Sequence, residues 1–237
     1  MFYRTLTEVE KVHIIEAFTV ELGKCYEQAI KERELEVLAN VDADLCKQVA
    51  IGLGLPAPKG KPPADVFESK ALSQVVETPG PIDGRKIGII AGADSDLAGV
   101  SKLVQAIERA GATPLVTAPF GGVLKSGRRS VIVERTLLTA RSIEYDAIVV
   151  AAGTTPARDI KLVLLLQEAF RHCKAVGAWG DGSDALAAAA IPLDGPGVLI
   201  ADTVDKAFTA ALESAVGLHR VWDRAVDVMA SEVAPAR

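Results

Sequence analysis

The segment between Leu55 and Gly84 divides the sequence into two parts of different character. It contains the runs Leu-Pro-Ala-Pro-Lys-Gly-Lys-Pro-Pro-Ala and Thr-Pro-Gly-Pro-Ile-Asp-Gly. The pattern before it is helical throughout, whereas candidate strands and helices alternate after it. Because proline and glycine interrupt regular structure and concentrate in linkers, we expect a helical segment over residues 1–54, a linker over 55–84 and an α/β domain over 85–230.

The N-terminal part carries the signals of three short helices. Thr7 and Glu10 form a capping-box pattern, and apolar residues follow them at three- and four-residue steps. A second helix is expected over residues 27–38, and a third after Asp42, which can cap it. About 50 residues bury only about 60% of their unfolded surface. We therefore expect this segment to pack on a larger body, within the chain or outside it.

The second part alternates short apolar runs with helical periodicity, which predicts a parallel sheet with helices on both faces. Strands are expected at 85–91, 113–118, 146–151, 174–179 and 198–201, and helices at 97–110, 160–172 and 204–225. In such sheets a binding site lies at the carboxyl ends of the strands. The loops that could form one are 92–96, 152–158 and 179–184.

Composition argues against several classes of function. The net charge is −5 and no run of lysine or arginine exceeds two residues, so no nucleic-acid partner is expected. Three cysteines without metal-type spacing suit a reducing compartment, and we expect a cytoplasmic protein. The apolar stretches are too short to span a bilayer and the first residues lack a signal-type apolar region, so no membrane role is expected.

Two of the loops offer a candidate binding site. The stretch Gly92-Ala-Asp-Ser-Asp96 leads into a helix and could cradle an anion, but its aspartates are also the residues that cap a helix without any ligand. Capping is the favoured interpretation. The stretch Gly180-Asp-Gly-Ser-Asp-Ala185 fits the Gly-x-Gly-x-x-Ala pattern of a dinucleotide site. Its aspartates would place negative charge at the pyrophosphate, which argues against that ligand.

The second of these loops can also be interpreted as a nucleophile elbow, a sharp strand-to-helix turn that presents one side chain above the sheet. The exposed position would be Trp179, or Gly180 if the alignment shifts by one, and neither is a nucleophile. Ser183 lies beyond the turn, and nothing in the sequence brings His172 or His219 to it. No catalytic residue is therefore predicted.

No metal site is predicted either. His13 has no second histidine or carboxylate at ligand spacing, and Cys173 is expected to be a small buried residue. If the crevice of the sheet retains a vestigial pocket, the residues expected to line it are Asp94, Thr154, Thr155, Trp179 and Asp181.

Several stretches of the first part resemble the closing helices of the haem catalases. They are His13-Ile-Ile-Glu-Ala-Phe-Thr-Val-Glu-Leu-Gly-Lys24, Leu38-Ala-Asn-Val-Asp-Ala-Asp-Leu45 and Val49-Ala-Ile-Gly-Leu-Gly-Leu-Pro56. Residues 69–230 are similar to the extra C-terminal domain of the large-subunit catalases. That similarity rests on Ser69-Lys-Ala-Leu-Ser-Gln-Val75, Gly84-Arg-Lys-Ile-Gly-Ile-Ile-Ala91, Asp146-Ala-Ile-Val-Val-Ala151 and Ala178-Trp-Gly-Asp-Gly182.

The resemblance implies a flavodoxin-like sheet related to the DJ-1/PfpI and class I glutamine amidotransferase folds. Enzymes among those relatives depend on an elbow cysteine, which Trp179 replaces here, so their chemistry does not transfer. In whole catalases the haem, its tyrosinate ligand and its distal residues lie upstream of these helices. Tyr3, Tyr26 and Tyr145 stand in other contexts. The resemblance thus implies haem in a parent protein and no cofactor in this chain.

Two functions from different classes follow. The first is a non-catalytic, stabilising piece of a catalase, an enzyme that converts hydrogen peroxide to water and oxygen in oxidative-stress defence. In that family, as the resemblance implies, the domain packs on the catalytic body of a homotetramer. The second is a holdase-like chaperone whose exposed apolar residues, such as Val12, Ile15 and Phe18, bind unfolded client proteins. A DJ-1-type small-molecule enzyme is a distant third.

Overall fold

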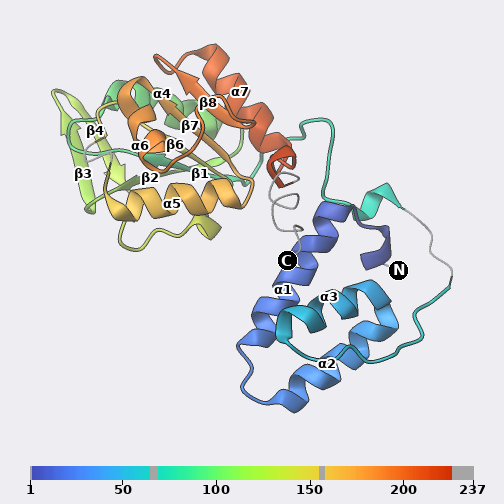
Figure 1. The fold of residues 1–237 in the computed structure, drawn as a ribbon. Coiled ribbons are helices and arrows are strands. Elements are labelled where there is room, and N and C mark those ends of the chain that lie inside the picture. The colour runs from blue at the N-terminus through green and yellow to red at the C-terminus, as the bar shows by residue number, and fades with distance from the viewer. Residues whose placement is uncertain (1, 65–68, 155–157, 226–237) are drawn as a thin grey trace. The chain divides into compact units, whose positions relative to one another are not determined.

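The computed structural model describes residues 2–64, 69–154 and 158–225. The chain divides into two compact units, Met1–Val75 and Val76–Arg237, which carry the helices α1 to α3 and the α/β elements respectively (Figure 1). The division falls inside the expected linker.

Three helices make up the first unit, as predicted: α1 (Glu8–Gly23), α2 (Gln28–Val41) and α3 (Ala43–Leu53). The capping box is confirmed, because the Thr7 side chain accepts from the Glu10 amide and the Glu10 carboxylate accepts from the Thr7 amide at 2.9 Å. Asp42 caps α3 by accepting hydrogen bonds from the two following helical amides. The predicted helix starts are therefore correct.

The segment after α3 runs back over this helical unit. The amide of Lys61 donates to Asn40 Oδ1 at 3.0 Å, and a short 3-10 turn follows at Lys70–Leu72. The amide of Gln74 then donates to Glu10 Oε1 at 2.6 Å, and the Ser73 hydroxyl donates to the same carboxylate. The buried Glu10 carboxylate thus caps α1 and also binds the segment at Ser73 and Gln74 to the start of this helix.

A six-stranded parallel sheet forms the centre of the second unit. Its spatial order is β5 (Arg135–Thr136), β2 (Thr113–Ala118), β1 (Lys86–Ile90), β6 (Ala147–Val150), β7 (Ala175–Trp179) and β8 (Val198–Ala201). Without the two-residue strand β5, the strands follow the 2-1-3-4-5 order of flavodoxin-like sheets. The predicted fold class is confirmed.

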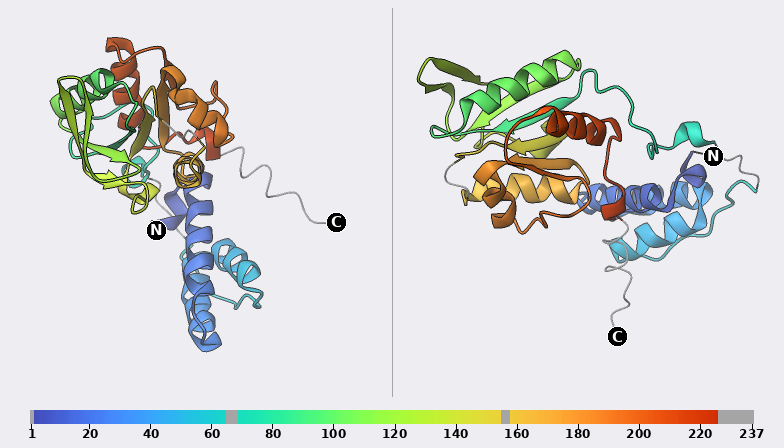
Figure 2. Two further views of the ribbon diagram at one scale, coloured as in Figure 1. Left: turned by 90° about the vertical axis from the view of Figure 1, so that its left-hand side faces the viewer. Right: turned by 90° about the horizontal axis from the view of Figure 1, so that it is seen from above.

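Helices cover both faces of this sheet (Figure 2). One face packs against α4 (Leu97–Arg109) and α7 (Lys206–Gly217), and the other against α5 (Ile160–Arg171) and α6 (Ser183–Ala188). All four residues of β6 are buried, as expected for a central strand with apolar layers on both sides.

Two features differ from the prediction. An antiparallel hairpin, β3 (Gly122–Ser126) and β4 (Arg129–Val133), lies in a stretch for which the sequence predicted no element. The prediction of a last helix reaching residue 225 is wrong, because α7 ends at Gly217. His219 takes the left-handed conformation with φ +68°, which ends the helix although no glycine marks this position.

Candidate site at the carboxyl edge of the sheet

The order of the strands reverses between β1 and β6, so the crevice that binds ligands in doubly wound sheets lies between the loops that follow these two strands. The loop after β1 leads into α4 and carries Asp94, which is exposed. The loop after β6 carries Thr154, which is buried. Trp179 ends β7 and Asp181 follows it. Thr155 lies outside the described residues.

The two loops are hydrogen-bonded to each other across this crevice. The Asp96 amide donates to the Ala152 carbonyl at 2.9 Å. The hydroxyls of Ser95 and Thr154 lie 3.1 Å apart, and the Thr154 hydroxyl donates to the Ala151 carbonyl at 2.7 Å. Both hydroxyl side chains are buried. The polar groups that would otherwise face a ligand are therefore paired within the chain.

Trp179 fills the space beside these loops. Its side chain is 1% exposed, and its indole Nε1 donates to Asp96 Oδ2 at 3.2 Å. Asp96 Oδ1 meanwhile accepts from the amides of Ala98 and Gly99, so the favoured capping interpretation of this loop is confirmed. A Cβ at Gly99 would lie 2.4 Å from Asp96 Oδ2. The close approach of indole, carboxylate and helix start thus requires glycine at that position.

The Asp181 carboxylate is also hydrogen-bonded within the protein. Its Oδ1 accepts from the Gly153 amide at 2.6 Å. The glycines of the dinucleotide-like motif form a 3-10 turn, Gly180–Gly182, followed by the six-residue α6. A Cβ at Gly182 would lie 2.6 Å from the Val150 carbonyl oxygen. Because glycine has no side chain, the turn can pack directly on strand β6. The space that a ligand would need next to this glycine is therefore filled by the protein's own backbone.

The same turn has the backbone of an elbow but not its chemistry. Gly180 has φ +57°, a conformation that is strained for an elbow residue with a side chain but open to glycine, whereas Trp179 has φ −127°. The Ser183 hydroxyl donates to the Gly180 carbonyl at 3.0 Å. His172 and His219 lie at the opposite edge, because they adjoin the starts of β7 and β1. No serine–histidine pair is formed by these residues.

The tyrosines do not fit the axial ligand of a catalase haem. Such a ligand is a tyrosinate. Burial, and to a smaller extent the negative charge of Asp42, raises the pKa of Tyr3 to about 12, which disfavours its tyrosinate form. Burial also raises the pKa of Tyr145, whose hydroxyl bonds to Thr117 at 2.9 Å. Tyr26 is fully exposed. Among the described residues no group of three or more histidine, cysteine or acidic side chains could hold a metal ion.

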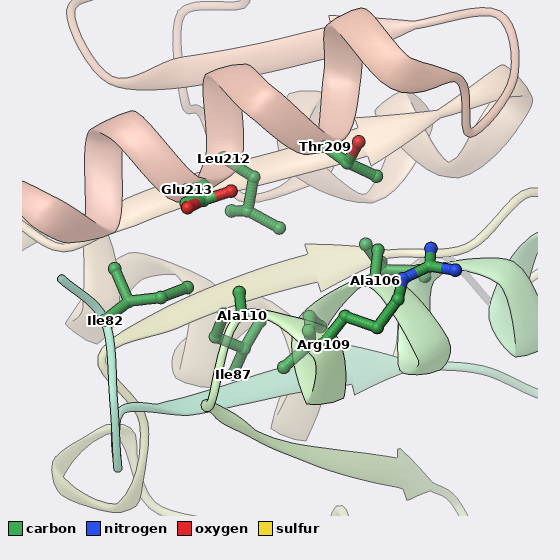
Figure 3. A pocket seen from close by; sticks show the side chains of 10 residues that line it. Ile82, Ile87, Ala106, Arg109, Ala110, Thr209, Leu212 and Glu213 are labelled. Carbon is green, nitrogen blue, oxygen red and sulfur yellow. The ribbon is translucent and has the colours of Figure 1, made fainter.

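Two grooves lie away from the crevice. One, of about 270 Å³, runs between α4 and α7 and is mainly aliphatic, with Arg109 and Glu213 at its rim (Figure 3). The Thr209 hydroxyl in this groove donates to carbonyls of its own helix. The other, of about 730 Å³, lies between residues 137–141 and α5. Neither groove is lined by a histidine or cysteine.

The structure thus places Thr154, Trp179 and Asp181 at one edge of the sheet and leaves Asp94 at the surface. The sequence-based pocket omitted Ser95 and Asp96, which make the contacts that close the crevice. The capping pattern of the loop was the signal that could have identified Asp96.

Comparison with known proteins gives the same family for both units. The family model described as the C-terminal domain found in long catalases matches residues 83–226. A second, described as catalase-related immune-responsive, matches residues 1–53.

No helix of the described residues is both long and apolar enough to cross a membrane.

Similar curated proteins are catalases. Catalase-2 of Bacillus subtilis (strain 168) is 33% identical over 95% of this chain and 33% of its own length. Catalase HPII of Mycobacterium avium is 35% identical over 97% of this chain and 35% of its own length. Catalase HPII of Pseudomonas putida is 34% identical over 100% of this chain and 34% of its own length. The chain spans about a third of the length of these relatives.

Proposed function

Since the chain belongs to the family of long catalases, whose C-terminal domain it carries, we propose that it is the C-terminal region of such an enzyme and has a structural role. The parent would convert hydrogen peroxide to water and oxygen in defence against oxidative stress, with its haem in the part that this chain lacks. The observation that carries the non-catalytic role is the closed crevice, in which the Ser95–Thr154 and Trp179–Asp96 bonds occupy the place of a ligand.

A surface on the α/β unit supports packing on a catalytic body. Four large aliphatic side chains on and near α5 are mostly exposed: Leu138 (67%), Ile143 (87%), Ile160 (65%) and Leu164 (56%). Two of them, Leu138 and Leu164, line the groove beside α5. Exposed apolar patches of this kind mark interaction sites. We propose that the catalytic body of a homotetramer covers Leu138 and Leu164, which share this groove.

The proposal is tested by adding the chain to the catalytic part of a long catalase, for example the Mycobacterium avium relative without its C-terminal third. The chain alone should release no oxygen from peroxide and show no Soret absorption. It should bind that body and lengthen the half-life of peroxide decomposition during heating.

Leu164→Glu should weaken the binding, whereas Ile132→Glu, at a similarly exposed position of the hairpin, should not. Peroxide decomposition by the purified chain would contradict the non-catalytic role, and unchanged heat inactivation of the body would contradict the stabilising role.

A holdase-like chaperone is the second candidate, because the helical unit also exposes apolar side chains. These are not the expected ones: Val12, Ile15 and Phe18 are all partly buried, and Ile15 and Phe18 pack against the helical core. Val20, Val37 and Ile51 are 57%, 56% and 64% exposed instead. This candidate predicts that equimolar chain suppresses aggregation of heat-denatured citrate synthase. Full aggregation of that client would eliminate it.

The remaining expectations stand as part of the same proposal. The boundaries 1–54, 55–84 and 85–230 are proposed as domain limits, and the cytoplasm as the compartment. A DJ-1-type enzyme has no supporting observation at the elbow, where Gly180 takes the left-handed conformation and carries no side chain.

A further inference from the structure

Basic side chains gather at the amino edge of the sheet, opposite the closed crevice. Arg85 directly precedes β1 and Lys174 directly precedes β7, and parallel strands start at the same edge. The segment after α7 adds three more basic residues at this place. We define the cationic cluster as Arg85, Lys174, His219, Arg220 and Arg224.

Two guanidinium groups of this cluster converge on one imidazole nitrogen. Arg85 Nη1 lies 3.1 Å and Arg220 Nη1 3.4 Å from His219 Nδ1. Guanidinium groups can only donate, so we infer that Nδ1 of His219 is the acceptor and that the ring carries its proton on Nε2. Burial and the two arginines lower the pKa of His219, in agreement with a neutral ring. The imidazole therefore separates the two cations without neutralising either.

The deeper members are cations without a counter-charge in contact. The buried Lys174 ammonium donates to the carbonyls of Ser142 and Tyr145. The buried Arg224 guanidinium donates through Nη2 to the Lys174 carbonyl and lies 4.2 Å from the centre of the Phe170 ring. The backbone carbonyls accept hydrogen bonds from these two cations and the Phe170 ring stacks on Arg224, but none of these groups carries a full negative charge. Burial lowers the pKa of Lys174 to about 8 and that of Arg224 to about 10.

Arg224 also retains donors that are not used. Its Nε and Nη1 atoms are buried and have no hydrogen-bond partner within residues 2–64, 69–154 and 158–225. Arg220 and Arg224 belong to one short segment after α7, in which the Val221 amide donates to the Cys173 carbonyl at 2.7 Å and the Arg224 amide donates to the Val221 carbonyl at 3.2 Å. Buried donors of a charged group are rarely left unpaired, and an unseen water or ion is a usual explanation.

The negative charge nearby does not balance the cluster. Asp146 pairs with Arg85 at 3.1 Å, and its second oxygen accepts from the Lys86 amide. Glu168 acts on Lys174 from a longer distance, and Asp223 is exposed; neither forms an ion pair with another described residue. Arginine and lysine near the ends of α5 and α7 also complement those helix dipoles. That effect explains neither the convergence on His219 nor the unused donors of Arg224.

We propose that the cationic cluster binds a small divalent oxyanion, of the size and charge of sulfate or phosphate, on the solvent side of Arg85 and Arg220. Both arginines are only partly buried, so an anion can reach them from solvent. Their planar forks suit tetrahedral oxyanions. Lys174 and Arg224 add positive potential from the interior, where it is screened least. His219 then gains a negative neighbour and takes up a proton more readily.

The experiment titrates the full chain with sodium sulfate and with sodium chloride at equal ionic strength and neutral pH, by calorimetry and by thermal unfolding. Sulfate should raise the unfolding temperature beyond chloride, since a ligand that binds the native state stabilises it. Arg220→Gln should weaken sulfate binding about tenfold, the loss expected for one charge-assisted hydrogen bond. Arg128→Gln, at the exposed hairpin turn, is the matched control and should bind as the parent chain does.

A second readout separates binding at the cluster from general salt effects. Proton NMR of the three histidines should show that sulfate raises the pKa of His219, and the chemical shifts of His13 serve as the internal control. This readout does not depend on the stability of a variant. Sodium acetate, a monovalent carboxylate, should have a smaller effect than sulfate. Equal effects of sulfate and chloride, equal effects of sulfate and acetate, or equal sulfate affinity in Arg220→Gln and the parent chain would each overturn the proposal.

Discussion

Replacing Trp179 by alanine tests whether its side chain takes the place of a ligand in the crevice. The indole is 1% exposed and is among the largest fully buried side chains of the described residues. Its removal deletes the Nε1 bond to Asp96 and leaves a cavity. Tryptophan-to-alanine substitutions in cores reduce the free energy of unfolding by about 3–5 kcal/mol. For a unit of this size, a loss of about 4 kcal/mol lowers the unfolding temperature by roughly 8–16 °C.

Trp179→Phe separates the two contributions. Phenylalanine keeps most of the ring in the crevice but cannot donate to Asp96, so it should lose about 1.5–3 kcal/mol, the contribution of a hydrogen bond to a charged group. The remaining difference between the two variants reports the cavity itself. Both free energies follow from urea unfolding of the chain monitored by far-UV circular dichroism.

Added indole provides the decisive measurement. An engineered apolar cavity of suitable size binds a small aromatic molecule, so indole should raise the unfolding temperature of Trp179→Ala and leave that of the unsubstituted chain unchanged. If Trp179→Ala loses less than about 1 kcal/mol, which is well below the range for buried aromatic residues, the crevice is not filled in the way described. Equal stabilisation of both chains by indole would show that indole binds elsewhere.

Three further predictions concern pH and backbone geometry. Burial opposes ionisation of Glu10, but hydrogen bonds to its carboxylate outweigh burial and hold its pKa below 4.5; unfolding midpoints of the helical unit should therefore fall as the pH drops below that value, and less steeply in Glu10→Gln. Burial lowers the pKa of Lys174 from 10.5 to about 8, so the unfolded chain binds more protons between these values. Stability of the α/β unit should accordingly rise with pH across that window by on the order of 3 kcal/mol, a rise that Lys174→Met removes in urea titrations at several pH values. Gly153 and Gly84 both have φ +72°, but only at Gly153 would a Cβ meet a neighbour, 2.3 Å from the Asp94 carbonyl oxygen; alanine at Gly84 should cost about 1 kcal/mol and alanine at Gly153 at least 1 kcal/mol more in unfolding free energy. Equal losses at the two glycines would refute the steric argument.

The features that could be predicted from sequence are those with a local cause. Thr7 with Glu10, and Asp42, mark helix starts through bonds to amides two or three residues away. The predicted strand 146–151 contains β6, because a buried central strand is a continuous apolar run between turns. The end of α7 was missed because His219 takes the left-handed conformation that usually belongs to glycine.

The contacts that define the two edges of the sheet could not be predicted in this way. Trp179 and Asp96 are 83 residues apart in the chain, and nothing local to either residue indicates the other. Arg85, Lys174 and Arg220 are just as dispersed, and meet only because parallel strands share one starting edge. The fold class follows from local periodicity, whereas a site on this fold depends on which strand ends are neighbours.

The two edges of the sheet differ in how their polar groups are satisfied, and this difference decides where an outside ligand can act. At the carboxyl edge the Ser95–Thr154 pair and the Trp179–Asp96 bond satisfy the loops from within. A ligand there would have to break these bonds before making its own, so its net gain would be small. At the amino edge Arg220 and the buried Arg224 form no ion pair with another described residue, so an anion would supply a counter-charge that no described carboxylate makes in contact with them. Ligand-induced stabilisation should therefore come from oxyanions at the amino edge, while nucleotides and other ligands of the carboxyl edge should leave the unfolding temperature unchanged.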